Sequence, residues 1–148
     1  MAGMPTIRDA VLDDLSALEA AERECFADPW NREQLRASLE SASTSCCVVH
    51  LPDAGLVGYC VFTVVADQAE LQSVAVRPAW RRRGIGSLLL EHVCARARGD
   101  GAARVWLEVR EGNTAAVALY RTHGFRQTGV RQGYYADGEN AFMMACDV

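Results

Sequence analysis

The stretch Leu71–Leu90, LQSVAVRPAWRRRGIGSLLL, predicts a strand, a turn and the start of a helix in one continuous piece of chain. Its apolar run Val74–Val76 contains β-branched residues, as a buried strand does. Pro78 then ends the strand, because proline cannot donate to the ladder of a central strand. The leucines that follow Gly86 begin an apolar stripe at helical spacing. This strand–turn–helix unit is the part of the sequence that decides the fold.

The turn in this unit has the chemistry of an anion-binding site. Arg81–Gly86 reads R-x-x-G-x-G, and its glycines allow a close backbone approach and positive φ angles. The N–H groups that open a helix lack intrahelical partners, and the helix dipole favours negative charge there, so a pyrophosphate fits. Arg81, Arg82 and Arg83 add positive charge. The pattern is short, and a helix N-terminus with a solvated basic turn is the other interpretation.

A strand, the pattern [QR]-x-x-G-x-[GA] and a helix together resemble the acetyl-CoA site of the GNAT N-acetyltransferase superfamily. The stretch lacks the G-x-G-x-x-G of a Rossmann dinucleotide site and the G-K-[ST] ending of a P-loop. The resemblance implies that pantetheine runs along the strand and that the pyrophosphate lies on the turn. By this resemblance the contacts to acetyl-CoA are Val74, Ala75, Val76, Arg82, Arg83, Gly84, Ile85, Gly86, Ser87 and Asn113.

Composition limits the classes to which the protein can belong. A chain of 148 residues, of which 50% are hydrophobic and 23% charged, suits one domain, residues 1–148, with a substantial core. The net charge of −4 argues against a nucleic-acid binder and permits a basic protein or peptide as partner. We expect no signal peptide and no membrane partner, because we find no basic-then-apolar leader and no apolar run of membrane-spanning length.

The six cysteines favour a reducing compartment. None forms C-x-x-C, and no histidine lies at metal-ligand spacing beside them, so we expect no metal site and a cytoplasmic protein. Cys46 and Cys47 fall in a predicted strand and are expected to be core residues, since no base can be assigned to either. His50, His92 and His123 are scattered along the sequence, and all three are interpreted as structural or exposed.

The remaining chain alternates helices and strands. Asp9 is the predicted N-cap of the first helix, Pro29 breaks the chain after it, and Asn31 caps the second helix. The expected strands are Thr6–Arg8, Cys46–Leu51, Leu56–Val65, Leu71–Val76, Arg104–Arg110, Phe125–Arg131 and Ala141–Cys146. The expected helices are Val11–Glu24, Arg32–Leu39, a helix from the glycine turn to Arg98, and a helix from Asn113 to Arg121. This order predicts an α/β (α+β) single domain with a mixed, mostly antiparallel sheet of about six or seven strands and about four helices, and it resembles the whole GNAT fold.

A second group of residues resembles a narrower family, the RimI-type ribosomal-protein alanine N-acetyltransferases. The pattern WLEVR-x-x-N-x-x-A-x-x-LY-x-x-x-GF begins at Trp106 and ends at Phe125. Two further stretches match that family: Phe26 with Pro29-Trp30, and Gly133-Tyr134-Tyr135 with Asp137-Gly138-Glu139. By this resemblance Glu108 corresponds to the general base and Tyr120 to the general acid. The residues implied to wall the peptide groove are Trp30, Tyr134, Tyr135 and Glu139, with Glu139 attracting the substrate ammonium.

Local chemistry alone leaves other interpretations of the two proposed catalytic residues open. Glu108 could be a half-exposed carboxylate that pairs with Arg110 or Arg104, because most carboxylates on strands have structural partners. Tyr120 could be a core aromatic of the helix on which it lies. Asn113 is a good helix N-cap, which is compatible with a coenzyme contact.

The resemblance implies transfer of an acetyl group from acetyl-CoA, as co-substrate, to the N-terminal α-amino group of a protein. The implied target is an alanine N-terminus of a small-subunit ribosomal protein, and the amine attacks the thioester directly. Ala136 stands where such hairpins often carry proline, and Asn140 where aspartate is common, which weakens the inference about peptide preference. The alternatives are a GNAT enzyme that acetylates Lys side chains or a small amine, and a non-catalytic acyl-CoA-binding sensor. The oligomeric state is left open.

Overall fold

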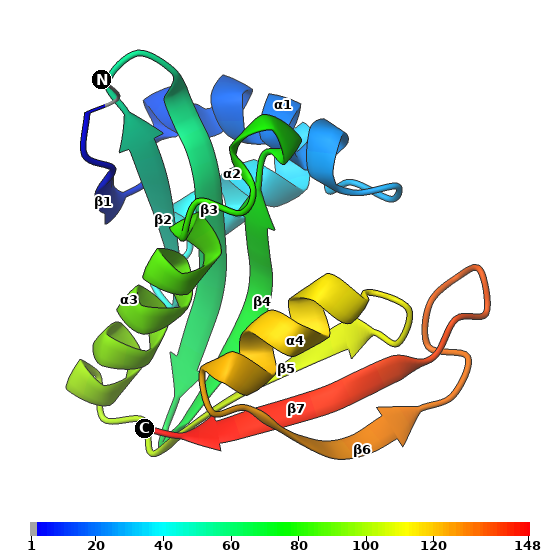
Figure 1. Cartoon of the computed structure of the whole chain (residues 1–148). Coiled ribbons are helices and arrows are strands. Elements are labelled where there is room, and N and C mark those ends of the chain that lie inside the picture. The colour runs from blue at the N-terminus through cyan, green and yellow to red at the C-terminus, as the bar shows by residue number, and fades with distance from the viewer. Residues whose placement is uncertain (1–2) are drawn as a thin grey trace.

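A seven-stranded sheet is the frame of the molecule, whose computed structural model describes residues 3–148. The strands lie in the order β1-β2-β3-β4-β5-β7-β6 (Figure 1). Their bounds are β1 Thr6–Asp9, β2 Thr44–Leu51, β3 Gly55–Val65, β4 Gln68–Val76, β5 Arg104–Arg110, β6 Arg126–Arg131 and β7 Ala141–Asp147. Only β4 and β5 pair in parallel among these strands, which confirms the predicted mixed, mostly antiparallel sheet.

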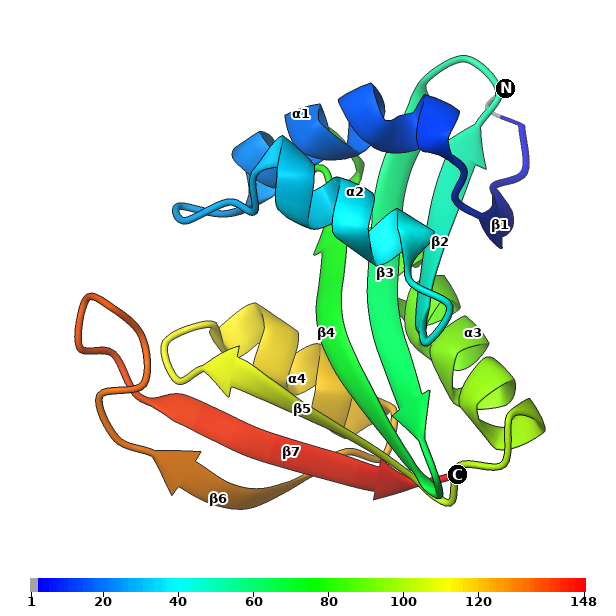
Figure 2. The ribbon, with the colours of Figure 1, turned by 180° about the vertical axis from the view of Figure 1, so that it is seen from behind.

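Four helices cover the two faces of the sheet unequally. They are α1 (Leu15–Cys25), α2 (Arg32–Glu40), α3 (Ile85–Gly99) and α4 (Thr114–Thr122). Helices α3 and α4 lie on the face turned to the viewer in Figure 1, and α1 and α2 cover β2, β3 and β4 on the opposite face, which leaves β5, β7 and β6 open there (Figure 2). Within residues 3–148, no helix is both long and apolar enough to cross a membrane.

Two apolar cores follow from this layering, one on each face of the sheet. The larger core lies under α3 and α4 and includes the fully buried Leu89 and the nearly buried Phe125. The smaller core lies under α1 and α2 and includes Leu18 and Tyr59. Strand β3 contributes to both cores because its side chains alternate between the two faces.

The alternating sequence of β5 determines which of its side chains face the open side. Val105, Leu107 and Val109 are buried in the larger core, under α3 and α4. Because successive side chains of a strand point to opposite faces, Glu108 and Arg110 lie on the face that α1 and α2 leave open. The apolar pattern of β5 therefore places the predicted base on an uncovered surface of the sheet.

The predicted N-cap of the first helix was wrong. Strand β1 continues through Asp9, and a 3₁₀ turn, Leu12–Asp14, precedes α1. Asp14 is the N-cap residue of α1, but its carboxylate serves the preceding 3₁₀ turn: it accepts a hydrogen bond from the Val11 N–H at 2.8 Å and two from the Arg8 guanidinium at 2.8 Å. The Asp9 carboxylate is bound elsewhere, because it accepts a hydrogen bond from Arg96 of α3 at 2.8 Å.

A β-bulge in β4 opens the middle of the sheet. Val61 of β3 pairs with Ser73 and the next residue, Phe62, pairs with Leu71, so Gln72 is an extra residue in β4. Bulges increase local twist and end pairing. The pairing of β4 with β5 ends at the same place, at Leu71 opposite Leu107. Beyond that point the two strands diverge (Figures 1 and 2), and the predicted site residues lie along the divergence.

Candidate active site

The turn before α3 has the backbone geometry of an anion-binding site. Gly84 caps the helix in the left-handed region, with φ at 81°, and Arg82 also has a positive φ of 64°. The Leu88 N–H donates to the Gly84 carbonyl at 3.0 Å and begins the helical ladder. The N–H groups of Ile85, Gly86 and Ser87 therefore precede that ladder, at the positive end of the helix dipole. This geometry fits the predicted pyrophosphate position.

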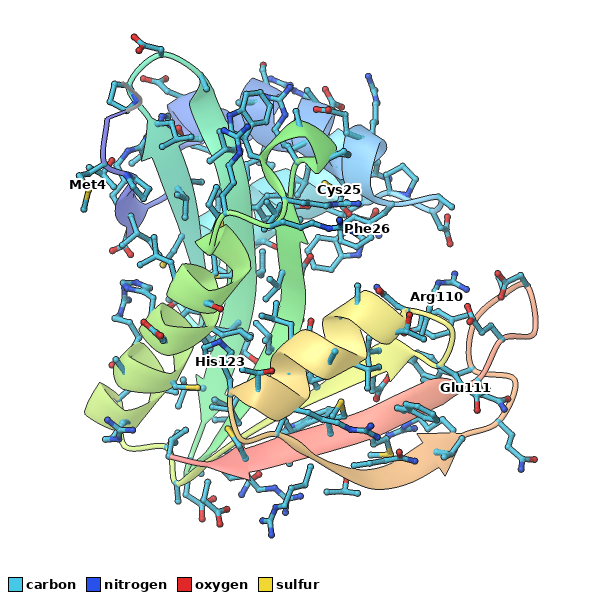
Figure 3. All side chains as sticks on the ribbon, in the orientation of Figure 1. Met4, Cys25, Phe26, Arg110, Glu111 and His123 are labelled. Atoms are coloured by element: carbon cyan, nitrogen blue, oxygen red, sulfur yellow. The ribbon has the colours of Figure 1, made fainter. Side chains whose placement is uncertain are left out.

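Contacts with α4 fix the turn from the other side. A Cβ on Gly86 would lie 2.9 Å from Leu119 Cδ2, so glycine at this position lets α3 and α4 approach closely. The Ser87 hydroxyl lies 2.9 Å from His123 Nε2, at the end of α4 that faces α3 (Figure 3). The sequence explained Gly86 by ligand approach alone, whereas the structure adds a packing reason.

The three arginines of the turn differ in their surroundings. Arg81 Nε donates to the Val76 carbonyl at 2.9 Å and so ties the turn to the end of β4. Arg82 and Arg83 are exposed at the mouth of the turn. Val74, Ala75 and Val76, the predicted pantetheine contacts, lie in β4 beyond the point at which pairing with β5 ends. The edge of β4 that faces away from β3 is thus available for a ligand that binds as an additional strand.

A groove of about 610 Å³ lies between α2, the bulged part of β4, β5 and the loop that precedes β7. It brings together Glu108 of β5, the aromatic residue after α1 and two tyrosines of the loop, as the resemblance implied. The lining residues are Trp30, Gln34, Ala37, Ser38, Glu70, Leu71, Gln72, Glu108, Tyr134 and Tyr135. Trp30 is held in place by its backbone N–H, which donates to the Oε1 atom of the buried Glu22 at 3.0 Å. Tyr120 and Glu139 do not belong to this lining, and the structure gives them other surroundings.

Glu108 is the carboxylate at the floor of the groove, and its side chain is 16% exposed. Its ion-pair partner is Arg131 of β6, whose Nε lies 3.2 Å from Glu108 Oε1. The alternative partners considered from the sequence, Arg110 and Arg104, do not take this place, since Arg110 pairs with Asp137 and Glu139. The Arg131 side chain is half exposed, so an incoming cation can compete with it for Glu108.

A second carboxylate, Glu70 of β4, lies in the same groove and was missed by the sequence reasoning. Burial, and secondarily the negative charge of Glu108, raise the pKa of Glu70. Glu70 lies opposite Trp106 in the parallel pairing, and Glu108 is two residues further along β5 on the same face of the sheet, so both carboxylates line the groove. No local pattern announces Glu70, because the sequence does not state which residues of β4 lie beside those of β5. The groove therefore holds two carboxylates, of which Glu108 is paired with Arg131.

Tyr120 lies on α4, on the other side of β5 from Glu108. It is 8% exposed and packs against Phe125, with ring centroids 5.7 Å apart, so the expected core role of this aromatic is also present. Burial, with a smaller contribution from Tyr135, raises the pKa of Tyr120 to about 12. The phenol therefore keeps its proton throughout the neutral and mildly alkaline range. Tyr135, which influences the pKa of Tyr120, is itself a lining residue of the groove. Tyr120 therefore lies in the core under α4 but close to the groove.

Glu139 fastens the loop before β7 and is not among the residues that line the groove. Its carboxylate accepts hydrogen bonds from Arg110 Nη1 at 2.8 Å and from the Gly112 N–H at 2.9 Å. Arg110 also donates to Asp137 at 2.9 Å and lies 4.0 Å above the Tyr135 ring, at the end of β5 shown in Figure 3. The charge of Glu139 is thus already paired. This geometry favours a positioning role over the attraction of the ammonium that the resemblance implied.

Asn113, the last predicted coenzyme contact, caps α4 with its side-chain oxygen, which accepts from the Ala116 N–H at 3.2 Å. Its amide NH₂ is left for a second partner, so the two functions are compatible. Among residues 3–148, no group of three or more His, Cys, Asp or Glu side chains is arranged to hold a metal ion.

Comparisons with known proteins agree with this geometry. The model of the acetyltransferase (GNAT) family matches residues 15–125. The [ribosomal protein bS18]-alanine N-acetyltransferase of Escherichia coli (strain K12) is 33% identical in an alignment 148 positions long that covers 98% of this chain and 99% of the relative. The crystal structure of the ribosomal-protein-S18-alanine N-acetyltransferase from Escherichia coli has a TM-score of 0.89 at 33% identity and covers 98% of this chain and 94% of that one.

Arabidopsis thaliana NAA60 in complex with acetyl-CoA shares the fold, with a TM-score of 0.90, 18% identity and coverage of 98% of this chain and 99% of that one. The family model covers most of the chain, and the Escherichia coli relative aligns with nearly all of it. The protein is therefore an acetyltransferase that belongs to the GNAT family, and within that family it resembles the RimI-type enzymes.

Proposed function

We propose that this protein transfers the acetyl group of acetyl-CoA to the α-amino group of a protein N-terminus, at an alanine of a small-subunit ribosomal protein. One observation carries the proposal: the pairing of β4 with β5 ends at Leu71, next to a groove that holds Glu108. The opening joins the groove to the strand and turn that fit a coenzyme. The Escherichia coli relative is a [ribosomal protein bS18]-alanine N-acetyltransferase, which supports the choice of substrate.

In this proposal, acetyl-CoA is bound mainly by backbone groups of β4 and of the turn before α3. Its pantetheine would pair with the free edge of β4 at Val74–Val76, and its pyrophosphate would accept from the N–H groups of residues 83–87. Arg82 and Arg83 would add positive charge at the mouth. The thioester would then lie where β4 and β5 diverge, with the groove on one side and Tyr120 on the other.

Proton transfer in the proposed reaction begins with Glu108. An α-amino group has a pKa near 8, whereas Lys titrates at about 10.4, so at pH 7 roughly a tenth of N-terminal amines are neutral against well under a thousandth of Lys amines. One carboxylate, acting directly or through a water, is adequate for the first and insufficient for the second. Glu70 would help to hold the ammonium until Glu108 takes its proton.

The remaining steps are direct attack and departure of the thiolate. The neutral amine forms a bond to the thioester carbon, and the carbon–sulfur bond then breaks. Tyr120 donates its proton to the leaving sulfur as the carbon–sulfur bond breaks; because the pKa of the phenol, about 12, lies above the thiol's of about 8.5, this transfer is uphill, and the phenolate then regains a proton from solvent. Trp30, Tyr134 and Tyr135 wall the peptide, while the Arg110–Glu139 pair keeps the loop in place.

Two peptides of the same sequence test this proposal. One begins with a free alanine; the other has a blocked N-terminus and an internal Lys. Incubation with acetyl-CoA, followed by mass spectrometry, should show on the free alanine peptide the mass gain of one acetyl group in place of a hydrogen, and almost none on the blocked peptide. Preference for the blocked Lys peptide would indicate a side-chain acetyltransferase. No turnover of either peptide, together with tight acetyl-CoA binding, would support a sensor.

A further inference from the structure

A row of polar and thiol side chains crosses the sheet on the side covered by α3, away from the groove. Asp9 of β1 pairs with Cys47 of β2, Cys47 pairs with Cys60 of β3, and Cys60 pairs with Val74 of β4. Directly opposite residues of antiparallel strands point to the same face. The thiols of Cys47 and Cys60 therefore lie side by side beneath α3.

The Cys47 thiol has three polar neighbours. His92 Nε2 of α3 lies 3.4 Å from its Sγ, Asp9 Oδ1 lies 3.5 Å away, and Arg96 Nη1 of α3 lies 3.9 Å away. Arg96 also donates to Asp9 at 2.8 Å. No base could be assigned to this cysteine from the sequence, because His92 is far from it in the chain. The fold supplies one.

Cys46, the preceding residue of the same strand, shows that burial alone does not create this environment. It points to the opposite face, into the apolar core under α1 and α2, and burial raises its pKa to about 12. The pKa of Cys47 is lowered, first by a hydrogen bond from Cys60 and also by the charge of Arg96, although burial and Asp9 act in the other direction. A structural cysteine is inert, whereas a thiol with cationic and donor neighbours is reactive.

His92 is suited to take the proton of Cys47. Burial, and then the charge of Arg96, lower the pKa of His92, so the ring is neutral at physiological pH and can accept a proton. Cys60, which donates to Cys47, keeps its own proton, because that contact and burial raise its pKa. The two thiols thus have different parts: Cys47 is the nucleophile and Cys60 is the second thiol.

We propose that Cys47 and Cys60 form a peroxide-reactive dithiol site, in which Cys47 is oxidised first and Cys60 closes a disulfide between β2 and β3. The site is independent of the acetyl-transfer mechanism. Its geometry is suitable, because opposite residues of an antiparallel pair have Cα atoms about 4.5 to 5.5 Å apart, and a disulfide needs about 4.4 to 6.8 Å.

The reaction balances with a hydroperoxide as the only oxidant. The Cys47 sulfur attacks one oxygen of the peroxide, the O–O bond breaks, and Cys47 becomes a sulfenic acid. The thiol proton passes through His92 to the departing oxygen, which leaves as water or an alcohol. The Cys60 sulfur then attacks the Cys47 sulfur, an S–S bond forms, the S–O bond breaks, and water leaves. Two thiols are oxidised and one peroxide is reduced.

Access favours a small oxidant. Both cysteines are fully buried, but two of the polar neighbours of Cys47, Asp9 and Arg96, have side chains that are 69% and 36% exposed. A brief opening of this ion pair admits a molecule of the size of hydrogen peroxide. Surface ion pairs of this kind contribute little stability, so the opening is frequent.

Peptide mapping after treatment with hydrogen peroxide tests the proposal on the reduced full chain. A protease that cleaves before Asp53 separates Cys47 from Cys60, so a disulfide joins two fragments whose combined mass is lower by two hydrogens. We expect this product in the wild type and in Cys46→Ala, and its absence in Cys47→Ala. Circular dichroism verifies the fold of each variant.

His92→Ala provides a second test that does not alter either thiol. The rate of disulfide formation should fall at least about tenfold, because general bases contribute this much or more. His50→Ala, whose ring contacts Arg8, is the matched control and should react at the wild-type rate. Wild-type kinetics in His92→Ala would overturn the assignment of the base. If Cys47 stays reduced in a sample in which Cys25 and Cys94 are oxidised, the proposed peroxide-reactive site is wrong. If Cys47 is oxidised while Cys60 remains a free thiol, the proposed disulfide is wrong.

Discussion

The coenzyme end and the acceptor end of the active site are built in different ways. The proposed coenzyme end consists of main-chain groups from one continuous stretch, β4 and the turn before α3, with Gly84 at a positive φ. The acceptor end consists of side chains from α2, β4, β5 and the loop before β7, with Glu108 at its floor. The first end is held by hydrogen bonds of the backbone, the second by packing and ion pairs between elements that are distant in sequence.

This difference teaches where a sequence reveals function. A site made from the backbone of one stretch needs only a few residue types in order, so the pattern R-x-x-G-x-G, together with the strand before it and the helix after it, is enough to suggest one. A site made from side chains of several elements depends on strand order and register. Variants should therefore act on coenzyme binding at one end and on turnover or peptide affinity at the other.

The largest effect expected from the variants that separate the two ends is that of Tyr120→Phe. Loss of the phenol proton should lower kcat about a hundredfold, as removal of a general acid does, with the Kd for acetyl-CoA unchanged. Because burial raises the pKa of Tyr120 to about 12, the wild-type kcat should not fall from Tyr120 ionisation below about pH 10. Calorimetry checks the Kd for acetyl-CoA. Steady-state kinetics between about pH 7 and about pH 10 check kcat.

Tyr59→Phe is the matched control for Tyr120→Phe. The Tyr59 hydroxyl is buried in the core under α1 and α2, and it has no hydrogen-bond partner among the described residues. Its removal should leave kcat unchanged. An unaltered kcat in Tyr120→Phe as well would reduce Tyr120 to a packing residue.

Gly84→Val should act on the other end, with a smaller effect. A β-branched residue at a φ of 81° is strained and alters the N–H groups that face the pyrophosphate, so the Kd for acetyl-CoA should rise about tenfold or more. Gly101→Val is the control, because Gly101 also has a positive φ and open space around its Cα but lies at the far end of α3. Equal Kd values for the two variants, measured by calorimetry on folded protein, would reject the turn as the coenzyme site.

The smallest effect concerns Glu139 and discriminates between its two possible roles. If Glu139 positions the loop through Arg110, then Glu139→Gln and Arg110→Gln should both raise the peptide KM a few-fold, with kcat nearly constant, because either change breaks the same ion pair. If instead the Glu139 charge attracted the ammonium, Arg110→Gln would free that charge and lower KM. Steady-state kinetics of the two variants with the alanine peptide distinguish the signs.

Most of the fold could be predicted from the sequence because local patterns determine it, and the structure gives the turn before α3 the backbone geometry that the pattern led us to expect. The strands and helices followed from hydrophobic periodicity along the chain and from the resemblance. The face of β5 on which Glu108 lies followed from the alternation of apolar residues in that strand. The bulge at Gln72 could not be predicted, because no particular residue type marks an extra residue in a strand. Glu70 was missed because it depends on the parallel register with β5.

Long-range contacts explain the remaining differences. Asp9 looked like an N-cap, but Arg96, 87 residues later in the chain, binds its carboxylate. Cys47 lacked a base until α3 brought His92 to it. Glu139 looked like a free charge until Arg110 and Gly112 were seen to bind it. In each case the deciding partner lies on another element, which a short pattern does not contain.

The pH–rate profile of Glu108→Gln tests the central claim most directly, with Glu70→Gln as the matched carboxylate control in the same groove. If Glu108 accepts the proton of an N-terminal amine, kcat/KM of Glu108→Gln for the alanine peptide should be lowest relative to wild type at low pH, where the amine is protonated. The deficit, about a hundredfold or more near pH 6, should shrink as the pH rises through the amine pKa of about 8. Glu70→Gln should show a much smaller deficit. A Glu108→Gln profile that parallels the wild type at every pH would remove Glu108 from the mechanism and contradict the account.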